Sequence, residues 1–411
     1  MDATAPCGEE RMTTVLKPRH FTRRPETVEA TPRVPPLRDL PAPRPSEGER
    51  ALLASAQGRI RHVFLVATRR MPGFDEGMLQ RLLNLSGGFD RISLAVHDGE
   101  AADFRGVVES LGLGAKTEII EAPAGAALWP WAQDRVAVFH NDNGVHVLEC
   151  AEAADYTGAA AAQALGTNNR ATLDQPPPGG NILVGGKICF VGADSGENRI
   201  DTRRAIEVIA CQPLARRGPT RFEMTPGDWT WRQDIDRSIA ADGSRQPVFH
   251  IDMFMTLAGT TPEGMPRILL GDPVWASELI GLPLPEGFPL KAFEQIDYGL
   301  RLRGYEVMRN PLPFIYFDDP DTKTREWFYA SANNCWVECM ADTPKGGDHV
   351  GCRVFLPEYG FGPWPELKAC DDTNAMLWEG LGFEVIRGGD FLPLADQLGS
   401  LNCVTRILAR A

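Results

Sequence analysis

Hydrophobic and polar positions repeat with two different periods along residues 58–411. Short apolar runs rich in β-branched residues, such as residues 60–68 and 90–98, predict buried strands. At residues 77–87 and 101–112, apolar positions recur every three or four residues, which predicts amphipathic helices. Another strand is expected at residues 116–123. The alternation of strands and helices predicts an α/β fold.

Two segments predict β-hairpins within this pattern. Residues 134–150 hold Asn143-Gly144 between apolar runs, and residues 181–194 hold Gly185-Gly186 in a similar position. Because hairpins pair their strands antiparallel, the predicted sheets are mixed rather than purely parallel.

The rest of the chain continues the mixture of strands and helices. A helix is expected over residues 198–212 and a strand over residues 247–259. Other strands are expected at 267–273, 305–313, 326–340, 352–360, 383–389 and 401–409, and helices at 290–304 and 371–382.

The first fifty residues differ from the remainder. They contain nine of the 33 prolines and nine lysines and arginines, with few apolar residues. This composition cannot bury enough apolar surface to order a chain, so residues 1–50 are expected to be a disordered or loosely docked arm. Residues 51–411 show no linker, and we expect a single domain there.

Charge and hydropathy narrow the range of partners. The formal net charge is −13, and no block of lysines and arginines suggests binding to nucleic acid or to an anionic membrane. No apolar run approaches the roughly 18 residues of a membrane span, and the N-terminal residues lack the apolar core of a secretory signal. We therefore expect a cytoplasmic protein, and its acidity suits a small cationic substrate.

The nine cysteines are scattered and odd in number, which indicates reduced thiols rather than a disulfide framework. Two groups of cysteine and histidine residues are candidates for zinc sites. Both lack the paired ligand spacing of such sites, and we expect no metal. The groups are Cys335 with Cys339 and Cys352, and His140 with His146 and Cys150.

Four apolar stretches each contain residues suited to catalysis. They hold Asp134, the run Gly179-Gly180-Asn181, the pair His250 and Asp252, and Cys403. Each has an ordinary structural explanation, such as a turn cap or a core thiol. Together they supply a thiol nucleophile, an acid/base and two carboxylates that could grip a planar guanidinium. Trp129 and Trp131 could form a wall of such a site and stack on the cation.

The order of these stretches resembles the guanidino-group modifying, or pentein, superfamily. Its agmatine-deiminase-like members show W-x-R-D, then E-G-G-N/D/S, then H-x-D-x-F, then G-G-x-x-H-C. The matching segments here are WAQD (131–134), PGGN (178–181), HIDMF (250–254) and GSLNC (399–403). The resemblance covers about residues 58–411.

The resemblance implies an α/β-propeller of five ββαβ-like units around a pseudo-fivefold axis. It implies a C–N hydrolase of the deiminase type, in which Cys403 forms a covalent amidino-thioether. His250 would be the acid/base, and Asp134 and Asp252 would hold the guanidinium. Gly179, Gly180, Asn181 and Trp131 would support the site. No cofactor is implied, the substrate would be a small guanidino compound or an arginyl peptide, and a homo-oligomer is left open.

The motifs depart from the family at three positions. Pro178 stands where an acid usually orients the histidine, and Asp174, shortly upstream, could replace it. Gln133 replaces an arginine or glutamate, and Asn402 replaces a histidine. Two other functions stay open: an amidinotransferase using the same cysteine, histidine and aspartates, and a non-catalytic pentein that binds a partner.

Overall fold

The structure is a computed structural model of the 411-residue chain. It describes residues 49–68, 71, 73–150, 155–173, 177–193, 200–209, 241–244, 250–261, 265–285, 288–319, 324–339 and 351–411. Almost all of the arm expected at residues 1–50 therefore lies outside the described residues. Asp174 lies outside them as well.

Helices and strands alternate along the described chain, as the periodicity predicts. The α-helices are α1 (Glu76–Ser86), α2 (Ala101–Ser110), α3 (Ala132–Arg135), α4 (Thr157–Leu165), α5 (Pro273–Ile280), α6 (Leu290–Leu302), α7 (Lys368–Gly380) and α8 (Leu392–Ala395). Short 3-10 turns are η2 (Gly179–Asn181), η5 (Ile251–Met253) and η6 (Pro365–Leu367).

The strands of the first half are β1 (Ala51–Leu52), β2 (Ile60–Val66), β3 (Arg91–Val96), β4 (Thr117–Glu121), β5 (Val136–Asn141), β6 (Gly144–Cys150), β7 (Arg170–Leu173), β8 (Ile182–Gly185), β9 (Ile188–Gly192) and β10 (Ala205–Ile209). Those of the second half are β11 (Ala241–Ser244), β12 (Met255–Thr260), β13 (Pro266–Asp272), β14 (Glu306–Pro311), β15 (Phe314–Asp319), β16 (Thr324–Tyr329), β17 (Trp336–Glu338), β18 (Arg353–Glu358), β19 (Glu384–Asp390) and β20 (Thr405–Arg410).

The same strand arrangement recurs in the sheets. An antiparallel pair is extended by a parallel third strand in β5-β6-β7, β8-β9-β10, β12-β13-β14 and β17-β18-β19. The C-terminal strand β20 pairs antiparallel with β2, which pairs parallel with β3. The last strand of the chain thus completes a sheet begun by the first long one, which ties the two ends of the described chain together.

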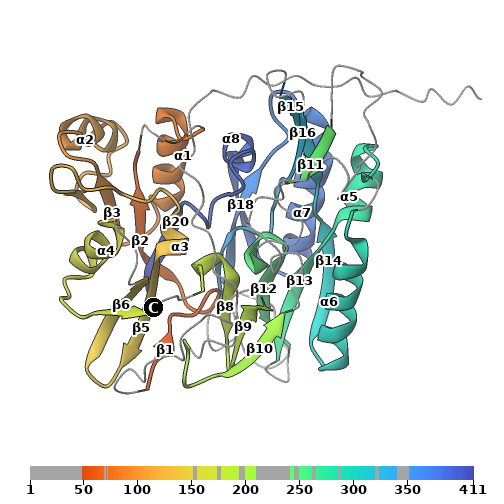
Figure 1. Cartoon of the computed structure of the whole chain (residues 1–411), viewed down its shortest axis with the longest axis horizontal. Coiled ribbons are helices and arrows are strands. Elements are labelled where there is room, and N and C mark those ends of the chain that lie inside the picture. Colours follow the sequence, from red (N-terminus) through yellow and green to blue (C-terminus); the bar gives the residue numbers. More distant parts are fainter. Residues whose placement is uncertain are drawn as a thin grey trace, which may run out of the picture.

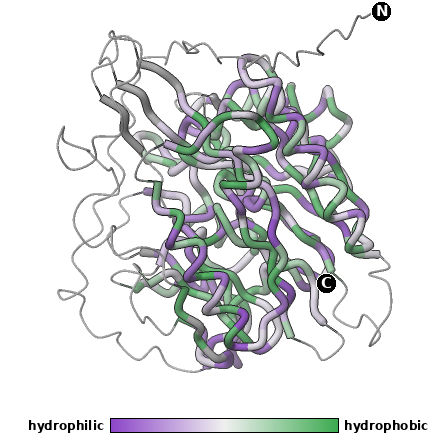
Figure 2. The backbone as a smooth tube through the Cα atoms, turned by 90° about the vertical axis from the view of Figure 1, so that its right-hand side faces the viewer, coloured by the Kyte–Doolittle hydropathy of each residue, from purple (hydrophilic) through white to green (hydrophobic). Residues whose placement is uncertain are grey.

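Helices lie on the outside and strands toward the middle (Figure 1). Helices α2 and α4 flank one side of the molecule, and α5 and α6 flank the other. Apolar segments run through the interior in the hydropathy view (Figure 2). The buried core includes large aromatic side chains such as Trp336, Trp364 and Phe254. Burial of such side chains is the main favourable term in folding.

Three predicted elements are wrong. The strand expected over 326–340 is in fact two strands, β16 and β17, which belong to different sheets. Residues 205–209 form the strand β10, parallel to β9, instead of part of a helix over 198–212. Three of the five residues in AIEVI are β-branched and favour a strand, and pairing with β9 gives the segment inter-strand hydrogen bonds. The strand expected over 247–259 begins only at Met255. Asp252 lies in the turn η5, and His250 immediately precedes that turn.

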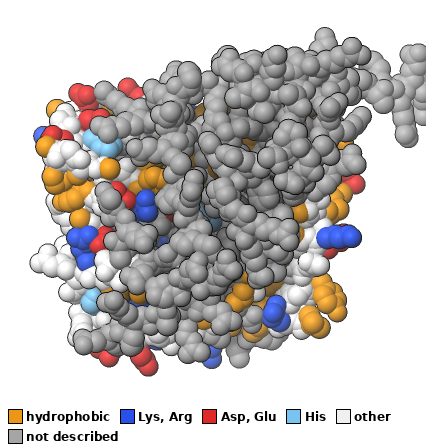
Figure 3. Space-filling model, in the orientation of Figure 1, with side chains coloured by type: hydrophobic (Ala, Val, Ile, Leu, Met, Phe, Trp, Pro, Cys, Tyr) orange, Lys and Arg blue, Asp and Glu red, His pale blue; other side chains and the backbone are white. Residues whose placement is uncertain are grey.

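The described surface carries both signs of charge. Figure 3 shows acidic, basic and apolar side chains close to one another along the left margin of this face. No helix in the described part of the chain combines the length and apolarity needed to cross a bilayer.

Candidate active site

Gly180 lies at the point where two of the predicted site segments meet. Its backbone N–H donates to Asp134 Oδ1 at 3.3 Å. A Cβ atom at this position would lie 2.8 Å from His250 Nδ1 and 2.9 Å from Asp252 Oδ1. His250 Nδ1 itself lies 3.7 Å from Asp134 Oδ1. The structure therefore brings three residues from two separate motifs together around a glycine, which belongs to a third motif and leaves room for them.

The neighbours of Gly180 explain the Gly-Gly-Asn run. A Cβ at Gly179 would lie 1.9 Å from the carbonyl oxygen of Gln133, so only glycine lets η2 approach α3 this closely. The buried Asn181 accepts a hydrogen bond from the Ile251 N–H through its Oδ1 at 3.2 Å. The run thus joins the segment of Asp134 to the segment of His250.

His250 has an unusual backbone conformation. Its φ is 43° and its ψ is 124°, a region that L-residues other than glycine rarely occupy. Such a conformation costs about 1–3 kcal/mol and persists only where the surroundings impose it. The residue is also buried, at the start of the turn that carries Asp252. This backbone conformation directs the His250 ring toward Gly180, and the backbone of a regular strand would direct it elsewhere.

Two asparagines hold one oxygen of Asp252. Asn334 Nδ2 donates to Asp252 Oδ2 at 2.8 Å, and Asn402 Nδ2 donates to the same oxygen at 3.0 Å. The other oxygen, Oδ1, is buried and has no hydrogen-bond partner among the residues that the structure describes. A buried carboxylate oxygen without a donor is costly, so Oδ1 is suited to accept an N–H from a bound cation.

The charge of Asp252 is held in balance by opposing effects. Burial raises the pKa of this carboxyl to about 8, the hydrogen bond from Asn402 opposes that rise, and the nearby negative charge of Asp134 adds to it. Asp134 keeps 24 % of its side-chain exposure, whereas Asp252 is 1 % exposed. The Asp134 carboxylate can therefore contact solvent, whereas the Asp252 carboxylate is buried.

Cys403 lies in the turn immediately before β20, not in the strand itself. Its N–H donates to Asn334 Oδ1 at 3.2 Å, and its carbonyl oxygen accepts from the Gln133 N–H at 3.2 Å. Its sulfur lies 3.9 Å from Met253 Sδ. Burial raises the pKa of the Cys403 thiol well above its usual range, and the carboxylates of Asp252 and Asp134 raise it further. Both effects favour the neutral thiol.

The tryptophans play different roles from each other. A Cβ at Gly399 would lie 2.2 Å from the Trp131 ring, so Trp131 packs directly against the turn that leads to Cys403. The Trp129 ring instead stacks on the guanidinium of Arg135, with the cation 4.5 Å from the ring centroid. Trp131 supports the site structurally, and Trp129 is occupied by a residue of this chain.

The resemblance predicts an acid at position 178. Pro178 stands there instead, immediately before η2, and its carbonyl oxygen accepts from the Asn181 N–H. The carboxylate beside His250 Nδ1 is that of Asp134. Asp174, the suggested substitute, lies outside the described residues.

Sequence reasoning missed the asparagines that hold Asp252. In the sequence, Asn402 stands out only as the replacement of a histidine, and the asparagines of the run YASANNCWV, Asn334 among them, receive no catalytic or binding role. The available signal was two adjacent polar residues inside an otherwise apolar run. For metals, no group of three histidine, cysteine or acidic side chains in the described ranges is arranged to hold an ion.

Comparisons with known proteins show what fold this chain has. No family model and no curated protein sequence matches the chain. Among solved structures, the agmatine deiminase of C. jejuni matches with a TM-score of 0.54 at 10 % identity, over 87 % of this chain and 96 % of that one. A protein provisionally assigned as an agmatine deiminase matches with a TM-score of 0.55 at 13 % identity, over 88 % and 96 %.

A provisionally assigned arginine deiminase of Porphyromonas gingivalis matches with a TM-score of 0.53 at 15 % identity, over 87 % of this chain and 98 % of that one. These solved structures are members of the pentein superfamily. At sequence identities this low, the matches show a shared fold and nothing more. The mixed α/β chain described here has the pentein fold that these structures share.

Proposed function

We propose that this chain is a hydrolase that acts on the guanidinium group of an arginine derivative through Cys403. The observation that supports it most directly is the convergence around Gly180: Asp134 comes from one segment, His250 and Asp252 come from another, and the two segments meet there. The backbone of Cys403 is tied to the same assembly through Asn334 and Gln133. The pentein fold makes this arrangement consistent with a guanidino-modifying enzyme.

The carboxylates would bind the substrate. A guanidinium is a flat cation with N–H groups on its edges, which carboxylates grip well. Asp252 Oδ1 lacks a partner, and Asp134 lies near it at the more exposed end of the pair. A bound cation would also offset the mutual repulsion of the two carboxylates, so substrate binding would lower the pKa of Asp252.

The same cation would activate the nucleophile. The Cys403 thiol is neutral because burial and two carboxylates disfavour a thiolate. A guanidinium placed between the carboxylates offsets part of that negative charge and so favours the thiolate. His250 would take the thiol proton as the sulfur attacks the guanidinium carbon and a C–S bond forms.

The remaining steps conserve the proton. His250 gives its proton to the departing nitrogen as the C–N bond breaks, which releases ammonia or an alkylamine. The amidino group then stays on the sulfur as a thioether. Water, deprotonated by His250, attacks this carbon, the C–S bond breaks, and the thiol is restored with a ureido product. No redox step or external cofactor is required by this scheme.

The strand pairing suggests how the site is enclosed. We infer that the repeated antiparallel-plus-parallel sheets surround a common axis, since β20 pairs with β2 and returns the end of the chain to its start. The site residues come from turns between these sheets: Asp134 from α3, His250 from η5 and Cys403 from the turn before β20.

The test is intact-protein mass spectrometry after rapid acid quenching with arginine, agmatine, dimethylarginine, N-acetylarginine and arginyl peptides. Ammonia and ureido products are assayed in parallel, with and without an added primary amine. An amidino adduct on Cys403 with ureido product supports the hydrolase, and amidino transfer to the added amine supports the transferase. A folded protein that forms neither adduct nor product with any of these compounds contradicts the proposal and favours a binding role.

A further inference from the structure

Arg406 connects the strand β20 to the segments that hold the carboxylates. Its Nη1 donates to Gln133 Oε1 at 2.9 Å, and Gln133 precedes Asp134 in the chain. Gln133 Nε2 donates in turn to the Gly179 carbonyl oxygen at 3.2 Å. A Cβ at Gly179 would lie 3.2 Å from Arg406 Nη1. The guanidinium of Arg406 is therefore packed directly beneath the glycine pair of the site.

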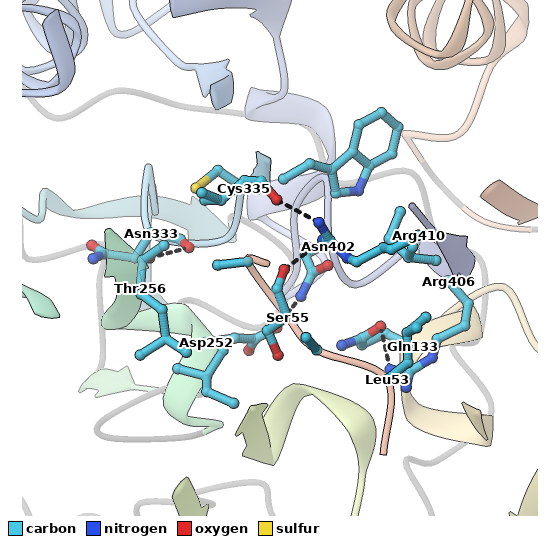
Figure 4. A pocket seen from close by; sticks show the side chains of 17 residues that line it. Leu53, Ser55, Gln133, Asp252, Thr256, Asn333, Cys335, Asn402, Arg406 and Arg410 are labelled. Atoms are coloured by element: carbon cyan, nitrogen blue, oxygen red, sulfur yellow. Dashed lines mark hydrogen bonds between the residues drawn. The ribbon is translucent and has the colours of Figure 1, made fainter. Parts of the chain in front are cut away.

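Arg406 and Asp252 also line one internal cavity. Its volume is about 50 Å³, and the two side chains reach it from opposite sides in the close-up (Figure 4). Within the described part of the chain, neither the buried Arg406 Nε nor the buried Asp252 Oδ1 has a hydrogen-bond partner. A cavity of this size has room for about three waters. The cation and the carboxylate thus act on each other across a polar cavity rather than through an ion pair.

The groups around Asp252 make the charge balance plain. The titratable and charged groups that act on it or lie beside it are Asp134, His250, Cys403, Cys335 and Arg406. Arg406 is the one permanent cation in this set. Burial lowers the pKa of Arg406 to about 10, and attraction to Asp134 and Asp252 opposes that effect. By reciprocity, Arg406 favours the ionised form of Asp252.

We propose that Arg406 is the resident counter-cation of the Asp134 and Asp252 carboxylates, and that Gln133 holds it back from the place where a substrate guanidinium binds. The inference rests on the proposed function, in which this pair binds the substrate. Without a cation behind them, the buried Asp252 carboxyl would resist ionising beside Asp134. Without the tether, Arg406 could itself pair with them and compete with the substrate. Arg406 is a positioning residue because it acts through the carboxylates.

The direct test follows the titration of Asp252 by NMR of protein carrying ¹³C-labelled aspartate, with Asp252→Asn to assign the signal. Arg406→Gln should raise the pKa of Asp252 by about one pH unit, a tenfold change in proton affinity, which is the effect of one cation several ångströms away at intermediate dielectric. Arg406→Lys keeps the charge and should stay close to the wild type. Arg410→Gln, which removes another arginine lining this cavity, is the matched control.

Arg410 donates to the carbonyl oxygens of Gly58, Val337 and Ser55, away from the site carboxylates, so its removal should move the Asp252 titration much less. Gln133→Met offers a second route that retains every charge. Freed from its tether, Arg406 should lower the pKa of Asp252 and weaken binding of guanidinium ion about tenfold. Circular dichroism and thermal unfolding confirm which variants are folded.

The titration separates this inference from the proposed function. If Arg406→Gln is folded and Asp252 titrates as in the wild type, the counter-cation role is wrong, whatever the activity. If Arg406→Gln does not fold, unchanged titration and guanidinium binding in Gln133→Met overturn it. If the expected shifts occur and the wild type processes no guanidino compound, the electrostatic role stands and the proposed reaction fails. With an active enzyme, Arg406→Gln should also raise KM about tenfold near neutral pH, with kcat changed less.

Discussion

Replacing Asp252 by asparagine should remove activity and make the protein more stable at alkaline pH. The side chain is 1 % exposed, and its Oδ2 accepts from Asn334 and Asn402. An asparagine oxygen can accept both of these hydrogen bonds and keeps the shape of the side chain. What the substitution removes is the ability to ionise inside the protein. The variant therefore separates the functional need for a charge from the stability that the charge costs.

The magnitude follows from the pKa. An exposed aspartate titrates near 3.8, and burial raises the pKa of Asp252 to about 8. Because the folded state holds the proton more tightly than the unfolded chain, stability from this group is greatest below pH 4 and falls as pH rises toward 8. Between pH 5 and pH 9 the wild type should thus lose up to about 4 kcal/mol that Asp252→Asn keeps, at about 1.4 kcal/mol per pH unit.

Urea unfolding at pH 5, 7 and 9 measures this difference. Asp371 shifts in the same direction, because burial raises its pKa to about 7, so only the difference between wild type and Asp252→Asn isolates Asp252. Asp371→Asn is the matched control: its oxygen accepts from the Tyr359 and Gly360 N–H groups, outside the site. It should reduce the pH dependence and keep turnover. Parallel stability curves for wild type and Asp252→Asn would refute the reasoning.

Further predictions concern the site itself. Gly180→Ala places a Cβ within 3 Å of His250 Nδ1 and Asp252 Oδ1 and should lower kcat/KM at least about a hundredfold, whereas Gly106→Ala, with open space around its Cβ, should keep activity; equal rates would contradict the crowding. Cys403→Ser should stay folded and form no covalent adduct by intact mass, and retained turnover would exclude Cys403 as nucleophile. Asn402→Ala removes a donor to Asp252 and should raise its pKa, so kcat/KM should fall more at pH 7 than at pH 9; a pH-independent loss would point to a packing role. In the wild type, kcat/KM should rise with pH up to about 8 as Asp252 ionises, and kcat should level off at lower pH because a bound cation favours the carboxylate.

The sequence alone determined the local features of this protein. Periods of two and of three to four residues predicted the alternation of strands and helices, because they record which side of an element faces the core. Asn-Gly and Gly-Gly placed the hairpins β5-β6 and β8-β9, since these residues tolerate the backbone of tight turns. The four motifs also named Asp134, His250 and Asp252, which the structure brings together.

Only the tertiary structure decided how those residues are oriented and charged. Asn402 reaches Asp252 across 150 positions, and Arg406 reaches Gln133 across 273. Such contacts depend on how the sheets pack, and no local period records them. The same holds for the backbone of His250, where an expected strand became a strained turn because Asn181 and Gly180 pack against it. Local chemistry selects the residue types of a site, and long-range packing sets their distances, burial and protonation.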